Sequence, residues 1–166
     1  KQFEQSHSFY FLLEGEVNFS ISVENNSDEF SVGKSDEQFT PIGWSGFRAP
    51  NRYATTVRCD TPCTLLKWSL DKLIKLFDED PLIGKNFLCF VLQKAVHLLN
   101  QVWSELTKFN NSDWYVDFGQ ESESEQENAT YAVLTPLELL RQSPFFEIFT
   151  ENELDKLAGI AEKKYY

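Results

Sequence analysis

The chain has 166 residues, of which 42% are hydrophobic and 15% aromatic, enough for one domain or one domain plus part of another. Its formal net charge of −11 at pH 7 argues against nucleic acid or an anionic membrane surface as a partner of the whole chain. No uninterrupted run approaches the roughly 18 apolar residues of a membrane span, so we expect no membrane insertion.

Strand-like patterns occupy the first 69 residues. Residues 9–23 predict two strands, with Glu14-Gly15 as the turn or bulge between them. Further short strands are expected over 30–32, 53–58 and 63–68, with turns over 25–28, 33–36 and 60–62. Many short strands with frequent turns are typical of a β-roll, barrel or sandwich.

The pattern becomes helical after Ser69, a favourable N-cap. This helix is broken before Pro81, and a longer one is expected from Pro81 to about Lys108. The apolar stripe of helix 81–108 fits two roles, packing on the roll and self-association or contact with another protein.

The remainder of the chain divides into two parts. Residues 110–133 include an acidic run without apolar residues, which predicts a solvated linker. Residues 134–166 contain a capping box, Thr150-x-x-Glu153, that predicts a further helix, and a strand is expected near the C-terminal tyrosines.

A loop between two strand patterns is the best candidate for a ligand site. It combines glycines, hydroxyls and an arginine, groups that can present backbone N–H donors and a guanidinium to a small anion. The candidate ligand-binding residues are Gly43, Trp44, Ser45, Gly46, Arg52, Tyr53, Ala54 and Thr55.

The order of these elements resembles that of the cyclic nucleotide-binding domains. Phe9–Val17 (FYFLLEGEV) is similar to a strand pair of that family, and residues 43–57 lie where it keeps its phosphate-binding cassette. Residues 57–69 and 70–108 resemble the strand pair and the two helices that follow. The resemblance implies a mainly β fold, a double-stranded β-helix or jelly-roll-like β-roll with C-terminal helices. It also implies a regulatory domain that is not an enzyme, with a cyclic nucleotide as the ligand to test.

The resemblance also implies a domain plan. Residues 1–109 match one roll that lacks its first strands, and residues 134–166 resemble the opening helix and first strand of a second module. The chain contains no Met, so we expect a piece cut from a longer tandem array. An alternative stays open, in which residues 134–166 complete the first roll by folding back or by exchange between chains.

The candidate cassette departs from the family pattern. That family holds the ribose with a Gly-Glu pair and the cyclic phosphate with an arginine, but here Trp44 follows Gly43. Counting back from residues 57–69 places Tyr53 at the arginine position, whereas a one-residue loop deletion would bring Arg52 into register. Trp44 fits either a stacking role on a purine or a place in the core. Losing both charged groups favours a cassette that no longer binds cyclic AMP or cyclic GMP.

Two functions therefore stay open. One is a sensory domain that relays ligand or partner contact to neighbouring modules. The other is a degenerate β-roll that acts as a protein–protein interaction or dimerisation module without nucleotide binding.

Other chemistry finds little support in the chain. The histidines, His7 and His97, lie in different elements, so we expect no metal, no cofactor and no catalytic residue. An acidic segment rather than a basic helix-turn-helix follows helix 81–108, so we expect no nucleic-acid partner. Three cysteines without framework spacing favour reduced thiols in the cytoplasm.

Overall fold

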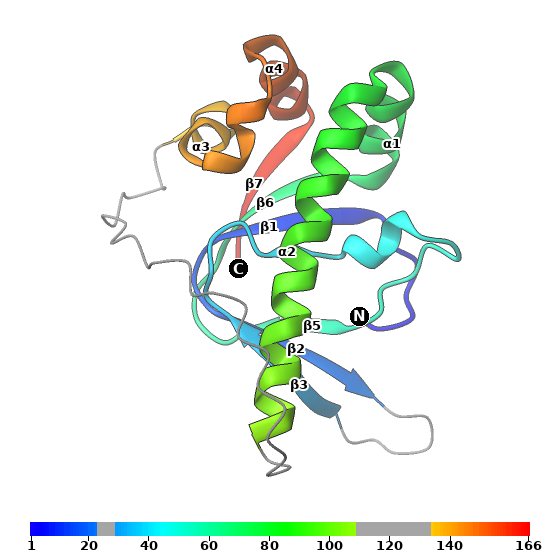
Figure 1. The fold of residues 1–166 in the computed structure, drawn as a ribbon, viewed down its shortest axis with the longest axis vertical. Coiled ribbons are helices and arrows are strands. Elements are labelled where there is room, and N and C mark those ends of the chain that lie inside the picture. The colour runs from blue at the N-terminus through cyan, green and yellow to red at the C-terminus, as the bar shows by residue number, and fades with distance from the viewer. Residues whose placement is uncertain (23–28, 109–133) are drawn as a thin grey trace.

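The computed structural model describes residues 1–22, 29–108 and 134–166, which form two sheets with helices packed against them (Figure 1). The strands are β1 (Ser8–Glu14), β2 (Val17–Ser22), β3 (Glu29–Ser35), β4 (Pro41–Ile42), β5 (Thr56–Cys59), β6 (Thr64–Ser69) and β7 (Ala161–Tyr165). The helices are η1 (Trp44–Phe47), α1 (Leu70–Glu79), α2 (Pro81–Lys108), α3 (Pro136–Gln142), η2 (Pro144–Ile148) and α4 (Glu151–Gly159). This arrangement confirms the predicted mainly β roll with C-terminal helices.

The strands of the described residues form two antiparallel sheets, with the orders β4-β1-β6-β7 and β3-β2-β5. Phe9 of β1 lies opposite Trp68 of β6, and Phe19 of β2 lies opposite Val57 of β5. Consecutive strands β1 and β2 therefore belong to different sheets. The predicted turn at Glu14-Gly15 is a corner between the sheets, not the loop of a hairpin.

Two corners of the roll pack against each other. Gly15 has a φ of +96°, and a Cβ at this position would lie 2.5 Å from the Pro62 carbonyl oxygen in the β5–β6 connection. The Asp60 N–H donates to the Glu16 carbonyl (2.8 Å), and the Glu16 N–H donates to the Thr61 hydroxyl (2.8 Å). The β1–β2 and β5–β6 connections each pass from one sheet to the other, and these contacts hold the two connections together.

Strand β1 is buried on both faces, which explains its uninterrupted apolar sequence. Phe9, Phe11 and Leu13 belong to a helix-side core, shared with β6 and the helices. Leu12 belongs to a second, roll-side core together with Val17 and other residues of the strands. A strand buried on both sides needs no polar alternation, so its sequence is a continuous apolar run.

Helices α1 and α2 begin and end close to the predicted positions. A Cβ on Gly84 would lie 2.8 Å from the Phe77 Cβ, so the two helices approach closely. One face of α2 is buried against the roll through Ile83, Phe87, Phe90, Val91 and Ala95. By length and composition alone, the window Pro81–Asn100 could cross a membrane, with a mean hydropathy of 1.3. Charged residues interrupt this window, so a search for unbroken apolar runs does not detect it.

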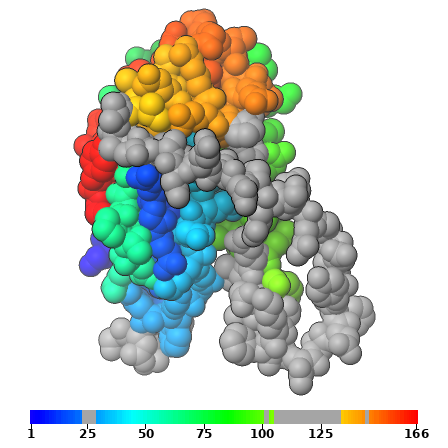
Figure 2. Space-filling model, turned by 90° about the vertical axis from the view of Figure 1, so that its left-hand side faces the viewer, coloured from blue at the N-terminus to red at the C-terminus, as the bar shows by residue number. Residues whose placement is uncertain are grey.

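The C-terminal segment 134–166 shares the core of the roll. Strand β7 pairs with β6, with Ala161 opposite Trp68, and the Trp68 Nε1–H donates to the Leu157 carbonyl (2.9 Å). Leu139, Leu140, Phe146 and Leu157 are almost completely buried. Figure 2 shows this segment, coloured yellow to red, on one end and one flank of the molecule. Residues 110–133, predicted as an acidic linker, lie outside the described residues.

Two local predictions are wrong. The strand expected over 53–58 begins only at Thr56, as β5, so residues 53–55 belong to the loop before it. Residues 33–36 were expected to form a turn, but β3 continues to Ser35, which lies opposite Val17. The Lys34 ammonium forms ion pairs with the carboxylates of Glu16 (3.0 Å) and Asp60 (2.5 Å). Cross-strand pairing in this sheet therefore prevails over the local turn propensity of Gly33.

Candidate functional site

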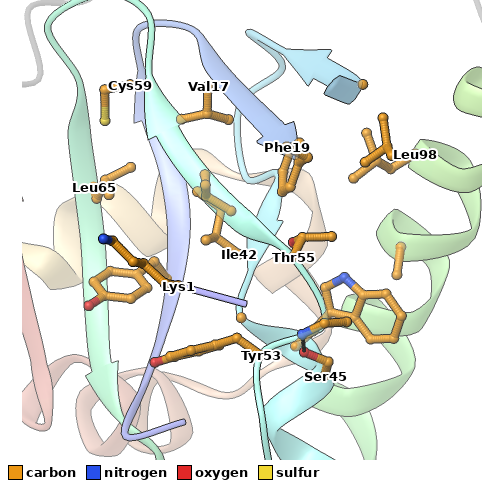
Figure 3. Close-up of a pocket in the computed structure, with 18 of the residues that line it drawn as sticks. Lys1, Val17, Phe19, Ile42, Ser45, Tyr53, Thr55, Cys59, Leu65 and Leu98 are labelled. Carbon is orange, nitrogen blue, oxygen red and sulfur yellow. Dashed lines mark hydrogen bonds between the residues drawn. The ribbon is translucent and has the colours of Figure 1, made fainter. Parts of the chain in front are cut away.

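A cavity of about 350 Å³ lies between the strands of the roll and helix α2 (Figure 3). Three parts of the chain form its walls: the strands, the loop between β4 and β5, and one face of α2. The strand residues that line it include Tyr10, Val17, Phe19, Val32, Ile42, Val57, Cys59 and Leu65. Its size is at the lower end of that of small-molecule pockets, about 300–1,000 Å³.

The loop between β4 and β5 reaches the cavity through a tight turn at Gly43. Gly43 has a φ of +82°, and a Cβ there would lie 2.9 Å from the Ser8 carbonyl oxygen and 3.0 Å from a Tyr53 ring carbon. A side chain would need strained backbone and would meet fixed atoms, so glycine fits this position. The turn leads into η1, which places Trp44 and Ser45 at the cavity wall.

Hydrogen bonds within the loop already satisfy several polar groups that could otherwise receive an anion. The Ala54 N–H donates to the Ser45 hydroxyl (3.0 Å), and the Gly46 N–H donates to the Gly43 carbonyl (3.0 Å). The Tyr53 hydroxyl donates to the Ser8 carbonyl (2.9 Å) and accepts from the Ser8 N–H (3.1 Å). Burial raises the pKa of the Tyr53 phenol, because the phenolate would lose solvation.

The structure brings six of the eight candidate residues to the cavity and places two elsewhere. Gly43, Trp44, Ser45, Tyr53, Ala54 and Thr55 line it. Gly46 is buried against Ser6 and Leu70 instead. Arg52 is exposed and donates from Nη1 to the Phe3 carbonyl, and it is not among the lining residues. Of the two candidates for the arginine position, Tyr53 lines the cavity and Arg52 does not.

Helix α2 supplies a wall that the sequence analysis did not assign to the site. Ala95, Leu98 and Leu99 line the cavity, and Figure 3 shows Leu98 across the space from Phe19. The apolar stripe of α2 includes these residues, but periodicity cannot distinguish a side chain against a cavity from one in solid core. Lys1 and Tyr166 also line the cavity. Both are far in sequence from the loop, and no motif predicts that they lie beside it.

The lining is apolar and almost uncharged. Among the described residues that line the cavity, Lys1 is the one with a charged side chain, and none is Asp or Glu. The thiol of Cys59 belongs to the wall, while burial and the neighbouring Cys59 raise the pKa of the Cys63 thiol to about 11. Across the described residues, no three or more His, Cys, Asp or Glu side chains are grouped so that they could hold a metal ion.

No protein-family model matches the sequence, and no curated protein matches it either. Among solved structures, it is similar to a cyclic nucleotide-binding domain from Methylobacillus flagellatus KT, with a TM-score of 0.57 and 16% identity. That match covers 69% of this chain and 64% of the other. It is also similar to the c-di-GMP responsive global regulator CLP of Xanthomonas campestris, with a TM-score of 0.56, 16% identity and coverage of 68% and 55%. The chain thus spans less than two thirds of either structure, and it has the fold of the cyclic nucleotide-binding domains.

Proposed function

We propose that this chain is a regulatory, non-enzymatic sensory domain, in which a small molecule bound in the cavity changes the arrangement of helix α2. One observation supports this more than any other. Leu99 lines the cavity, and 55% of its surface is exposed. A change at the cavity wall therefore acts on a residue that neighbouring modules or a partner can contact.

The outer face of α2 carries a regular apolar seam, which we define as Cys89, Leu92, Val96, Leu99 and Trp103. These residues are separated by alternating steps of three and four, the a/d spacing of a coiled coil, and all are exposed. Trp103 is 69% exposed. We propose that the seam pairs with the seam of a second copy of this chain.

The two features together define a mechanism. A ligand shifts an equilibrium only if it binds one arrangement better than the other. Because Leu99 belongs to both the cavity and the seam, an occupant that moves Leu99 changes how well two seams fit. Ligand binding thereby changes the free energy with which two copies associate. Neighbouring modules respond to that change in association.

Thermal shift and sedimentation velocity together test the sensory function. Cyclic AMP, cyclic GMP, cyclic di-GMP and the neutral probe N-phenyl-1-naphthylamine are each added, and an increase in melting temperature identifies a binder. The dissociation constant of the dimer is then measured with and without that binder. We expect it to change by at least several-fold. A binder that leaves it unchanged would contradict the sensory function.

Cysteine chemistry tests the seam itself. In a parallel pair the two Cys89 thiols lie side by side, so mild oxidation is expected to give a covalent dimer. Cys89→Ser is expected to abolish this product. Leu92→Asp removes one apolar seam residue and is expected to give a monomer. A dimer that survives Leu92→Asp would show that the interface lies elsewhere.

The second candidate function is an interaction module that self-associates through the seam but binds no small molecule. The exposed position of Arg52 favours this alternative over a cyclic-nucleotide sensor, because none of the described residues that line the cavity carries a guanidinium. The two functions differ in one result. The interaction module dimerises with an unchanged dissociation constant in the presence of every molecule of the panel. We also infer a cytoplasmic location, since the described cysteines are free thiols.

A further inference from the structure

We propose that the cavity takes a flat, uncharged, apolar small molecule of two or three aromatic rings, and not a phosphate-bearing nucleotide. This inference rests on the proposed sensory function, and it names the class of ligand for the same cavity. Three properties of the wall carry it: its aromatic and aliphatic side chains, the prior use of its polar groups, and its volume.

The wall provides surfaces that suit a flat apolar molecule. Phe19 of β2, Trp44 of η1 and Tyr53 of the loop before β5 contribute aromatic rings. Ile42 and Leu98 add aliphatic side chains to the same wall. Aromatic rings stack on or meet the edge of another ring with favourable energy beyond that of area burial, so a flat ligand gains most from such a wall.

Charged groups that could compensate a phosphate are absent from the described wall, apart from one lysine. Arg52 is turned outward to the Phe3 carbonyl, and Arg58 is paired with Glu29 (2.7 Å). Neither arginine lines the cavity, and the cationic side chain among the described lining residues is that of Lys1. A ribose phosphate loses its hydrating water on entry, and burying an uncompensated charge is costly.

Two backbone donors of the loop are already engaged and so do not replace the missing charges. The N–H groups of Gly46 and Ala54, in the loop where the sequence suggested an anion site, already bond to the Gly43 carbonyl and the Ser45 hydroxyl. A nucleotide would have to displace these bonds before it could use the donors. An uncharged ligand leaves them intact, and so binds without that cost.

The volume sets the size of the ligand. An engineered apolar cavity of about 150 Å³ holds one benzene ring. The cavity here, about 350 Å³, is a little more than twice as large. It therefore accommodates two or three rings, and an unbranched aromatic molecule of that size fills it.

Fluorescence titration with N-phenyl-1-naphthylamine tests the ligand class. We expect the probe to bind with a fluorescence increase that saturates, and Val57→Trp to reduce its affinity at least tenfold. Val57 lines the cavity on β5, at the edge of its sheet, so a larger side chain there fills the cavity without entering the helix-side core. Arg58→Gln is the matched control on the same strand, outside the cavity lining, and is expected to leave the affinity unchanged.

Two further variants separate binding in the cavity from binding at the seam and from nucleotide binding. Leu92→Asp alters the exposed seam, where an apolar probe could also bind. Titrated at a protein concentration at which the unchanged protein is monomeric, this variant is expected to keep the titration unchanged, because coupling to the dimer is then absent from both proteins. Thr55→Val removes a hydroxyl from the wall and is expected to keep or strengthen probe binding, whereas a nucleotide would lose a polar contact. Melting temperatures of all four variants establish that each protein is folded at the assay temperature.

The outcomes separate this inference from the sensory function. Displacement of the probe by cyclic AMP or cyclic GMP, or a probe affinity that Val57→Trp does not change, would overturn the ligand class. If a cyclic nucleotide binds and also changes the dimer dissociation constant, the sensory function holds and the ligand class fails. If the probe binds as expected but leaves that constant unchanged, the ligand class holds and the sensory function fails.

Discussion

Gly15 shows how a single residue holds the two sheets of the roll together. Its φ of +96° is a conformation that side chains rarely adopt, and a Cβ would lie 2.5 Å from the Pro62 carbonyl and 2.6 Å from the Cys63 Sγ. We expect Gly15→Ala to lower the free energy of unfolding by roughly 2–3 kcal/mol, from backbone strain plus displacement of the corner. Urea unfolding followed by tryptophan fluorescence measures this loss.

The matched control for that change is Gly159→Ala. Gly159 ends α4, and a Cβ there would meet no atom within 4 Å. Alanine is a better helix former than glycine, so this variant is expected to be neutral or more stable by up to about 1 kcal/mol. Equal destabilisation by the two substitutions would show that the corner at Gly15 is not specifically constrained.

Tyr53 predicts a dependence of stability on alkaline pH. Burial raises the pKa of its phenol above the ordinary value of about 10, so the folded protein keeps this proton to a higher pH than the unfolded chain. The resulting contribution is complete below about pH 10 and is lost as the pH rises through the folded-state pKa. Urea unfolding between pH 8 and pH 11 is expected to show this decline.

Tyr53→Phe isolates that contribution. The variant removes the hydroxyl that bonds both the N–H and the carbonyl of Ser8, so a loss of about 1–2 kcal/mol is expected at pH 8. Its stability is expected to fall less steeply above pH 10 than that of the unchanged protein. Identical slopes would mean that another group is responsible for the alkaline decline.

In the loop between β4 and β5, the sequence indicates the position of the site but not which side chain faces the cavity. Glycines, hydroxyls and an arginine between two strand patterns indicated this loop, and six of its residues line the cavity although the arginine does not. The choice between Arg52 and Tyr53 depends on a register of one residue, which local sequence does not encode. In the structure Arg52 forms an isolated antiparallel β-bridge with Gln5, near the start of the chain. This distant pairing accompanies the register that places Tyr53 at the cavity.

Helix α4 illustrates an element whose start is determined locally. The Thr150 hydroxyl accepts from the Glu153 N–H, and the Glu153 carboxylate accepts from the Thr150 N–H (2.7 Å). Thr150→Ala is expected to reduce stability by about 1 kcal/mol, because the first turn loses this cap. Thr150→Ser retains the hydroxyl and is expected to remain within a few tenths of the unchanged protein. Differential scanning calorimetry measures both, and equal losses would contradict the capping role.

Elements with local signals were predictable, and those that depend on distant partners were not. Pro81 and the apolar period placed α2 correctly, and Thr150 placed α4. The extension of β3 to Ser35 depends on pairing with Val17, and the alignment of β7 depends on β6. These pairings join residues far apart in sequence, so neither propensity nor spacing reveals them.

At the scale of the whole molecule, the helix-side core joins both ends of the described chain. Phe11 of β1 lies 6.2 Å from Phe146 between ring centroids, and Trp68 of β6 bonds to Leu157 of α4. The Lys156 ammonium also pairs with the Asp80 carboxylate (2.8 Å) and lowers its pKa. Residues 134–166 therefore share one core with the roll, and we propose, of the two domain plans left open, the one in which they complete this roll.

This proposal predicts one cooperative unfolding transition for the roll and the segment 134–166. Hydrogen exchange followed by mass spectrometry, over a series of urea concentrations, reports on peptides from β1, β6, α4 and β7 separately. We expect all of them to lose protection at the same urea concentration, because Trp68, Leu157 and Phe146 are buried in one core. Trp68→Phe removes the bond to the Leu157 carbonyl and is expected to lower the midpoint of every peptide together. If α4 and β7 open at a lower urea concentration than β1 and β6, the segment is a separate unit docked on the roll.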